Sequence, residues 1–143
     1  MAHPLEGNAL RAFLAAGTRT AKVAVTRKDG SPSVSPIWFV MDGDELVFTT
    51  MNTSLKYKAI QRDPRVAVAV DDETFPYGFV SIRGTAQIEN LTPEELFSWA
   101  TKIAARYVPP ERAEEFGRRN AVAEEVLVRI KPGQVFAWSG IAD

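Results

Sequence analysis

The fold is decided by residues 21–50, which read AKVAVTRKDG SPSVSPIWFV MDGDELVFTT. Along the first six residues, every second side chain is a good candidate for a buried face, and this period of two is typical of a β-strand. Asp29-Gly30 is a strong hairpin signal, and Asp42-Gly43 turns the chain a second time. The stretch predicts strands at 21–26, 33–41 and 46–50. Because short turns join them, we expect an antiparallel meander.

Outside this stretch, helix signals alternate with strand signals. Proline suits the first turn of a helix and glycine its end, so Pro4–Ala16 is predicted to be helical. Ser54 is a good N-cap for a helix that ends at Arg62, and Thr92 begins a capping box. The other predicted elements are a helix from Thr92 to Pro109, a short charged helix at 111–119, and strands at 66–70, 79–88, 126–130 and 134–138.

Two of these strands have particular features. The strand at 66–70 is apolar throughout, so we expect it to be covered on both faces. Gly84, inside the strand at 79–88, is typical of a bulge or a barrel corner. Seven short strands, mostly antiparallel, with two to four covering helices predict a single domain over residues 1–143. Its class is α+β, mainly β, and its architecture is a small β-barrel.

Composition excludes several kinds of function. The 17 Lys and Arg against 18 Asp and Glu leave a net charge of −1, which argues against broad electrostatic binding of nucleic acid. The sequence has no cysteine, which excludes disulfides, thiolate catalysis, iron–sulfur clusters and Cys-bound zinc. His3 is the only histidine, so Ser-His-Asp catalysis and multi-His metal sites are excluded as well. With no secretion signal or membrane-spanning run visible, we expect a cytoplasmic protein without a metal site.

The segment 49–58, TTMNTSLKYK, is the strongest candidate for a binding site. A strand ends in two threonines, and Ser54 caps a helix whose first turns carry Lys56 and Lys58. The free N–H groups and partial positive charge of a helix N-terminus suit a phosphate. The two lysines lie about 200° apart around the helix, so only one of them faces a bound anion. The alternative interpretation is a solvated surface turn.

Other candidates have a simpler structural interpretation. Trp38 and Phe39 are adjacent on a strand and face opposite ways, so one is expected in the core while the other is free to stack on an aromatic ligand. Trp138 suits a subunit contact, a ligand wall or the core. Glu124 and Glu125, like the other acidic pairs, are expected to be solvated or to cap a helix.

Six short motifs follow one another along the chain. They are Ala24–Pro32, Ser35–Phe39, Phe48–Thr50, Ser54–Lys56, Asp63–Val66 and Val80–Ala86. Each is weak by itself, but their order and spacing resemble the pyridoxamine 5′-phosphate oxidase-like superfamily of flavin and deazaflavin proteins. The resemblance covers most of the chain. It implies a split β-barrel and a homodimer with two cofactor sites at the subunit interface.

The resemblance also implies roles for individual residues. The matched positions are Pro36, Ile37 and Trp38 on the strand along the flavin-like ring, Thr49 and Thr50 at the strand end that contacts the cofactor, and Ser54 and Lys56 in the anion-binding turn. Lys56 matches the lysine that binds the cofactor phosphate. Lys58 is the second candidate for a cationic contact. No residue is assigned a catalytic role.

Several departures separate the chain from the vitamin B6 oxidases that it resembles. Those enzymes hold the phosphate and ring of FMN with two arginines and a glutamine, where this chain has Ser35, Leu55 and Phe79. The C-terminal residues 136–143 also lack the Arg and His of the oxidases' substrate motif. Oxidation of vitamin B6 is therefore not expected. The Pro-Ile-Trp strand and the Asp-Pro-Arg-Val turn are closer to the branch that uses the deazaflavin coenzyme F420.

That branch implies an oxidoreductase that transfers a hydride between F420 and a conjugated electrophile, quinone-like or tetrapyrrole-like. F420 has a phosphodiester that leads to a polyglutamate tail, which a dispersed set of lysines and arginines can hold. The cofactor carries out the bond-making, and the protein orients it. Two alternatives remain open: an FMN-dependent reductase of the same fold, and a non-catalytic split barrel that binds a flavin, haem or tetrapyrrole.

Overall fold

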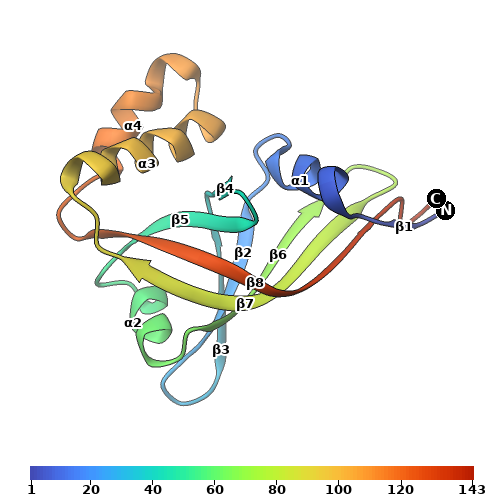
Figure 1. Cartoon of the computed structure of the whole chain (residues 1–143), viewed down its shortest axis with the longest axis horizontal. Helices are drawn as coiled ribbons and strands as arrows, with labels where there is room; N and C mark the ends of the chain where they lie inside the picture. Colours follow the sequence, from blue (N-terminus) through green and yellow to red (C-terminus); the bar gives the residue numbers. More distant parts are fainter.

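The computed structural model describes residues 1–143 and contains one curled, eight-stranded sheet with four α-helices around it (Figure 1). The strands are β1 (His3–Pro4), β2 (Ala21–Thr26), β3 (Pro32–Ile37), β4 (Val40–Asp42), β5 (Glu45–Met51), β6 (Arg65–Asp72), β7 (Gly78–Glu89) and β8 (Glu125–Ser139). The helices are α1 (Gly7–Ala15), α2 (Leu55–Arg62), α3 (Pro93–Tyr107) and α4 (Ala113–Asn120), with a 3₁₀ turn at Pro110–Arg112. The predicted α+β class, mainly β, is confirmed.

The order of the strands differs from a meander. It runs β3-β2-β6-β7-β8-β5-β4, with antiparallel pairs throughout, and β1 adds to β8. The chain passes from one end of this order to the other at Trp38 and Phe39, between β3 and β4. The prediction of one strand over 33–41 within a three-stranded meander is therefore wrong, because β3 pairs with β2 and β4 pairs with β5. This crossing connects the two ends of the sheet and closes it into a barrel.

The two longest strands, β7 and β8, pair along their length. The predicted strands at 126–130 and 134–138 are one strand, because Pro132 lies within the ladder opposite Gly84 instead of turning the chain. The register shifts between Arg83 and Gly84, which confirms the predicted bulge. A Cβ atom on Gly84 would collide with the carbonyl oxygen of Lys131, so the close approach of the strands requires glycine.

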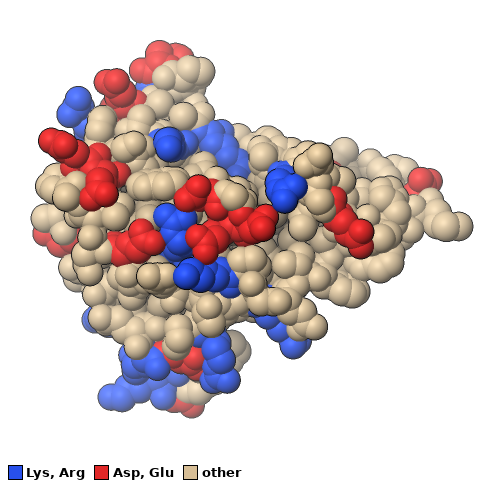
Figure 2. Space-filling view, viewed as in Figure 1, with Lys and Arg blue, Asp and Glu red and all other residues tan.

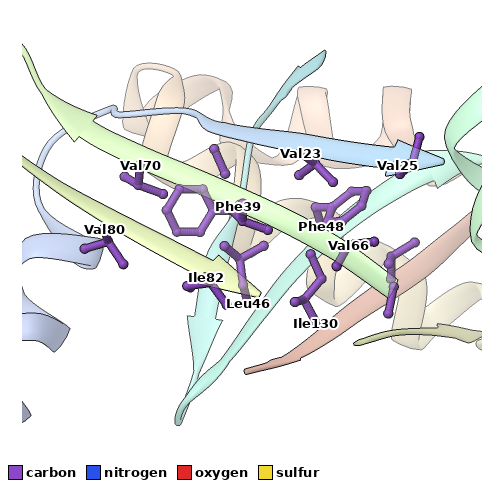
Figure 3. Packing of buried hydrophobic residues seen from close by; sticks show 14 of the residues in the cluster. Val23, Val25, Phe39, Leu46, Phe48, Val66, Val70, Val80, Ile82 and Ile130 are labelled. Carbon is purple, nitrogen blue, oxygen red and sulfur yellow. The ribbon is translucent and has the colours of Figure 1, made fainter. Parts of the chain in front are cut away.

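The core lies inside the barrel and is built from inward-pointing apolar side chains (Figure 3). Val23 and Val25 reach it from β2, and Val66 and Val70 from β6. On the opposite face of β6, Ala67 and Ala69 are exposed, so the prediction that both faces of this strand are covered is wrong for the single chain. The reason is that α1 and α2 pack against the core and α3 against β4 and β8, which leaves the outside of β6 without a cover.

Strand pairing and N-cap hydrogen bonds set the residues at which the helices begin. The first helix starts at Gly7 and not at Pro4, because Pro4 pairs with Trp138 in β1. Ser54 caps α2 as predicted, and the Thr92 capping box at the start of α3 forms both of its hydrogen bonds. The predicted charged helix is the 3₁₀ turn followed by α4.

All four helices are short, and α3 is the longest with 15 residues. None of them combines the length and the apolar surface that a membrane crossing requires. Acidic and imidazole side chains do not gather in groups of three that could hold a metal ion.

Candidate functional site

Most of the predicted site residues lie on β3, at the end of β5 and at the start of α2, a region that we call the corner, and Trp38 follows β3 in the link to β4 (Figure 1). The Lys56 ammonium on α2 donates a hydrogen bond of 2.8 Å to Ser35 Oγ on β3. Lys56 is half-buried, and burial lowers the pKa of its ammonium. No carboxylate pairs with this ammonium. A half-buried cation that contacts only a neutral hydroxyl is well suited to hold an anion.

Two hydroxyl groups build the turn from β5 into α2. Ser54 Oγ accepts a hydrogen bond of 3.1 Å from the Tyr57 backbone N–H, and it lies 2.9 Å from Thr50 Oγ1. Thr50 is buried, so both hydroxyls are engaged within the protein and fix the start of α2. Thr49 points to the opposite face of β5, because successive side chains of a strand alternate. The structure therefore brings Ser54 and Thr50 together and separates Thr49 from them.

At the end of β3, successive side chains point alternately into the core and out to the surface. Ile37 packs against the core, whereas Pro36 is exposed and Trp38 is 36% exposed. The Trp38 ring stacks on Tyr107 of α3, with ring centroids 5.0 Å apart and planes inclined by 7°. Phe39 is fully buried, which confirms that the two aromatic neighbours face opposite ways. The corner thus has one fixed aromatic wall, formed by Trp38.

Lys58 lies away from Lys56 and lines a separate groove of about 470 Å³. The other lining residues are Arg27, Lys28, Asp29, Thr53, Leu55 and Arg62. Four of the seven lining side chains are cationic and one is anionic, so we name this feature the basic groove. Figure 2 shows Lys and Arg gathered at the end of the molecule where Figure 1 has α2 and the β2–β3 turn. Of these four cations, only Lys58 is predicted from the sequence to have a site role. Arg62 lies one turn further along α2, whereas Arg27 and Lys28 join the groove only because the β2–β3 turn folds beside α2.

Glu125 also lies at this corner, although its place in the sequence predicts no role in the site. It begins β8 and stands opposite Met51, the last residue of β5. The prediction of a solvated pair fits Glu124, which is exposed, but is wrong for Glu125, which is half-buried. Burial raises the pKa of its carboxyl group to about 7. Only the pairing of β8 with β5 reveals this position.

The outside of β6, of residues 78–85 in β7 and of residues 131–139 in β8 forms one face that no helix covers, where small and aromatic side chains lie beside polar ones such as Arg83 and Gln134. Ala67 and Ala69 are exposed on it. An aromatic row continues it, with ring centroids 6.1 Å apart between Phe79 and Phe136 and 6.0 Å apart between Phe136 and Trp138. Phe136 is 59% exposed. Trp138 is therefore part of an open aromatic surface and not of the barrel core.

A known family has this architecture. The family model described as pyridoxamine 5′-phosphate oxidase matches residues 7–139, which run from α1 to the end of β8. The chain belongs to this family. The match confirms the resemblance drawn from the short motifs of the sequence. No curated protein matches the chain.

Solved structures support the pyridoxamine 5′-phosphate oxidase-like fold. A conserved hypothetical protein from Mycobacterium tuberculosis is 24% identical with a TM-score of 0.79, over 96% of this chain and 87% of that one. An F420 reductase is 27% identical with a TM-score of 0.66, over 90% and 95% of the two chains. An FAD-binding protein from Mesorhizobium loti is 21% identical with a TM-score of 0.70, over 96% of each chain. The predicted split β-barrel is confirmed.

Proposed function

We propose that the protein is an oxidoreductase that transfers a hydride between coenzyme F420 and a conjugated small-molecule electrophile of the quinone or tetrapyrrole type. The observation that carries the proposal is the presence of two separate cationic features on α2, the unpaired Lys56 ammonium and the basic groove that Lys58 and Arg62 line. F420 has a phosphodiester followed by a polyglutamate tail, so it needs cations spread along a path. In this proposal Lys56 holds the phosphodiester, and the basic groove holds the glutamate carboxylates. The likeness to an F420 reductase supports it.

The same residues suit FMN less well. FMN ends in a phosphate, which the vitamin B6 oxidases hold with arginines at the positions of Ser35 and Leu55. Here the Ser35 hydroxyl accepts a hydrogen bond from Lys56, and Leu55 is an exposed apolar side chain. A hydrogen bond to a charged group contributes about 1.5–3 kcal/mol. The loss of two such bonds would weaken FMN binding by on the order of a hundredfold or more.

The other site residues position the cofactor in this proposal. When bound, F420 supplies the hydride chemistry, and the chain supplies orientation and a dry surface. Pro36 and Trp38 would contact the deazaflavin ring from β3 and the residue after it, and Thr49 would contact it from β5. Ile37 anchors this stretch in the core. The linked hydroxyls of Thr50 and Ser54 hold the anion-binding turn in place.

We further propose that two copies of the chain form a homodimer across the uncovered face, with a cofactor site on each side. The small side chains of Ala67 and Ala69 allow a second sheet to approach closely. Val34 of β3 is 67% exposed and lies on the same face, because it pairs with Ala24 and Ala24 pairs with Ala67. A copy that docks on this face reaches from the aromatic row to the corner at Pro36.

Ligands that differ only in their tail test the role of the basic groove. We expect F420 with a long glutamate tail to bind more tightly than the same deazaflavin without glutamates. The double variant Lys58→Ala/Arg62→Ala should lose about tenfold in affinity for the tailed ligand and none for the other. Lys102→Ala, which removes an exposed cation on α3, is the matched control. Equal affinity of wild type for both ligands would overturn this assignment.

A flavin-binding protein of the same fold is the second candidate, either an FMN-dependent reductase or a non-catalytic carrier. The likeness to an FAD-binding protein favours it. Oxidation of bound reduced cofactor by a quinone separates an enzyme from a carrier. Cofactor preference separates F420 from FMN.

A further inference from the structure

Glu125 lies beside the residues that the proposed function assigns to the cofactor ring. In the β5–β8 ladder it stands opposite Met51, and Thr49 lies two residues earlier on the same side of β5. Side chains directly opposite in such a ladder have Cβ atoms about 5 Å apart, and diagonal neighbours lie about 7 Å apart. The Glu125 carboxyl group is therefore within reach of a ligand that rests on Thr49 and Met51.

This carboxyl group has no partner within the protein. Arg129 lies on the same face of β8 and binds three carboxylates, those of Asp42, Glu45 and Glu89. Glu125 has neither an ion pair nor a side-chain hydrogen bond, although it is half-buried. A half-buried carboxyl group without any partner has no evident structural role and is free to act on a ligand.

The raised pKa of Glu125 does not come from neighbouring charges. The charged groups of the neighbouring elements have other partners. Arg129 binds three carboxylates, and Lys56 donates a hydrogen bond to the Ser35 hydroxyl. Arg118 lies over the ring of Phe97, and Arg119 lies over the ring of Phe116. On β5, Thr49 and Met51 carry no charge. Burial alone raises the pKa of Glu125 to about 7. Near neutral pH this group can therefore both release and regain a proton.

We propose that Glu125 is the proton donor of the reduction, an inference that rests on the proposed function. With a quinone as the electrophile, bound reduced F420 would supply the hydride and be oxidised by two electrons, and the quinone that takes up this hydride would become a hydroquinone anion. The O–H bond of Glu125 breaks while a new O–H bond forms on the charged quinone oxygen. The Glu125 carboxylate then regains a proton from water.

The variant Glu125→Gln tests this role, because glutamine has a similar shape but no acidic proton. Oxidation of reduced F420 by menadione, a naphthoquinone, is followed from about pH 5 to about pH 9. We expect the wild-type rate to fall about tenfold per pH unit above a pH of about 7. The Gln variant should be about a hundredfold slower at low pH, and its rate should not fall in this way. Glu124→Gln, which changes the exposed neighbour, should behave as wild type.

A second measurement does not depend on turnover. Carboxyl carbon NMR of the protein without cofactor should show one glutamate that titrates near 7 in place of 4.5, and this signal should be missing in Glu125→Gln. Added F420 should shift that titration, because the ring lies beside the carboxyl group. A Glu125 titration near 4.5 would overturn the inference.

The outcomes separate the inference from the function on which it rests. A wild-type protein that does not bind F420 refutes the proposed function before any variant is compared. If wild type binds F420 and reduces menadione while Glu125→Gln keeps the same rate and pH profile, the donor assignment is wrong and the function stands. A folded Glu125→Gln protein that loses F420 affinity would also overturn it, since Glu125 would then be a binding residue.

Discussion

Lys56 is the single residue on which cofactor binding depends most. Its only partner is the Ser35 hydroxyl at 2.8 Å, and burial lowers the pKa of its ammonium. We expect Lys56→Ala to weaken F420 binding by about 1.5–3 kcal/mol, or about ten- to a hundredfold. The free energy of unfolding should barely change, because alanine is a better helix former and the half-buried charge is removed. Titrations followed by tryptophan fluorescence measure the affinity, and denaturation measures the stability.

Lys58→Ala is the comparison on the same helix, measured with the deazaflavin that carries the phosphodiester but no glutamates. It should affect the phosphodiester contact less, because its side chain lines the basic groove. Added salt should weaken the binding of wild type more than that of Lys56→Ala, since the variant lacks the screened interaction. Equal F420 affinity of folded wild type and folded Lys56→Ala would return this segment to a solvated surface turn.

Glu125 also makes stability depend on pH without any ligand. Its pKa is raised from 4.5 to about 7, so the folded state binds the proton more tightly than the unfolded chain does. The stabilising effect is fully present below pH 4.5 and is lost as the pH rises through about 7. One pKa unit corresponds to about 1.4 kcal/mol. Because solvent screens a half-buried group, we expect the free energy of unfolding to fall by only about 2 kcal/mol over this pH range. Urea unfolding at several pH values measures this loss of stability. In Glu125→Gln the loss between low and high pH should be smaller by this amount. An identical pH dependence in both proteins would contradict the burial of this carboxyl group.

Among the helices and strands, short sequence motifs correctly predicted the turns and helix caps, whose structure depends on residues close by in the chain. The Asp29-Gly30 turn and the cap at Ser54 are both present, because each depends on side chains and backbone torsions close by. The bulge at Gly84 is present as well, and there the glycine itself is the signal, although the carbonyl group that requires it belongs to Lys131 on β8. The division of 33–41 into β3 and β4 depends instead on which distant strands pair, and an alternating pattern carries no such information. The unbroken length of β8 depends on β7 for the same reason.

In the candidate site as well, residues placed by local structure could be predicted from the sequence, whereas residues placed by the pairing of distant strands could not. Lys56 could be named from the sequence because the helix start that surrounds it is a local structure. Glu125 could not, because only β5 brings it to the corner, from a segment far along the chain. Arg27 and Lys28 join the basic groove through the β2–β3 turn, whose position beside α2 is again set by the whole sheet.

The α3–α4 pair makes a prediction at this scale. A Cβ atom on Gly117 would collide with Thr101 Oγ1 and lie 3.0 Å from Thr101 Cα. Helix propensity alone predicts that Gly117→Ala stabilises the protein by about 1 kcal/mol. The collision predicts the opposite sign, a loss of about 1–3 kcal/mol. Chemical denaturation measures which sign holds.

The double variant Thr101→Ala/Gly117→Ala is the control. Thr101 Oγ1 is buried without a hydrogen-bond partner, so its removal costs little and takes away the nearest colliding atom. We expect the double variant to recover part of the stability that Gly117→Ala loses. A single variant more stable than wild type would show that α4 does not pack closely on α3.

For the whole molecule, the uncovered face predicts a homodimer. Sedimentation at micromolar concentration should give about twice the chain mass of 15.8 kDa. Phe136→Glu places a charge on the aromatic row and should shift the protein to monomers with weaker F420 binding. Val122→Glu, which changes an exposed apolar residue before β8, should leave the dimer intact. A wild-type protein that sediments only as a monomer would contradict the interface.

The measurement that tests the proposed function most directly is the affinity of one cofactor-free preparation for F420 and for FMN. Each is titrated separately, and the fluorescence of Trp38 at the corner contributes to the signal. We predict that F420 binds more tightly, by on the order of a hundredfold, because Lys56 and the basic groove hold a long anionic tail while Ser35 and Leu55 offer no charge to a terminal phosphate. FMN binding as tight as that of F420, or tighter, would contradict it.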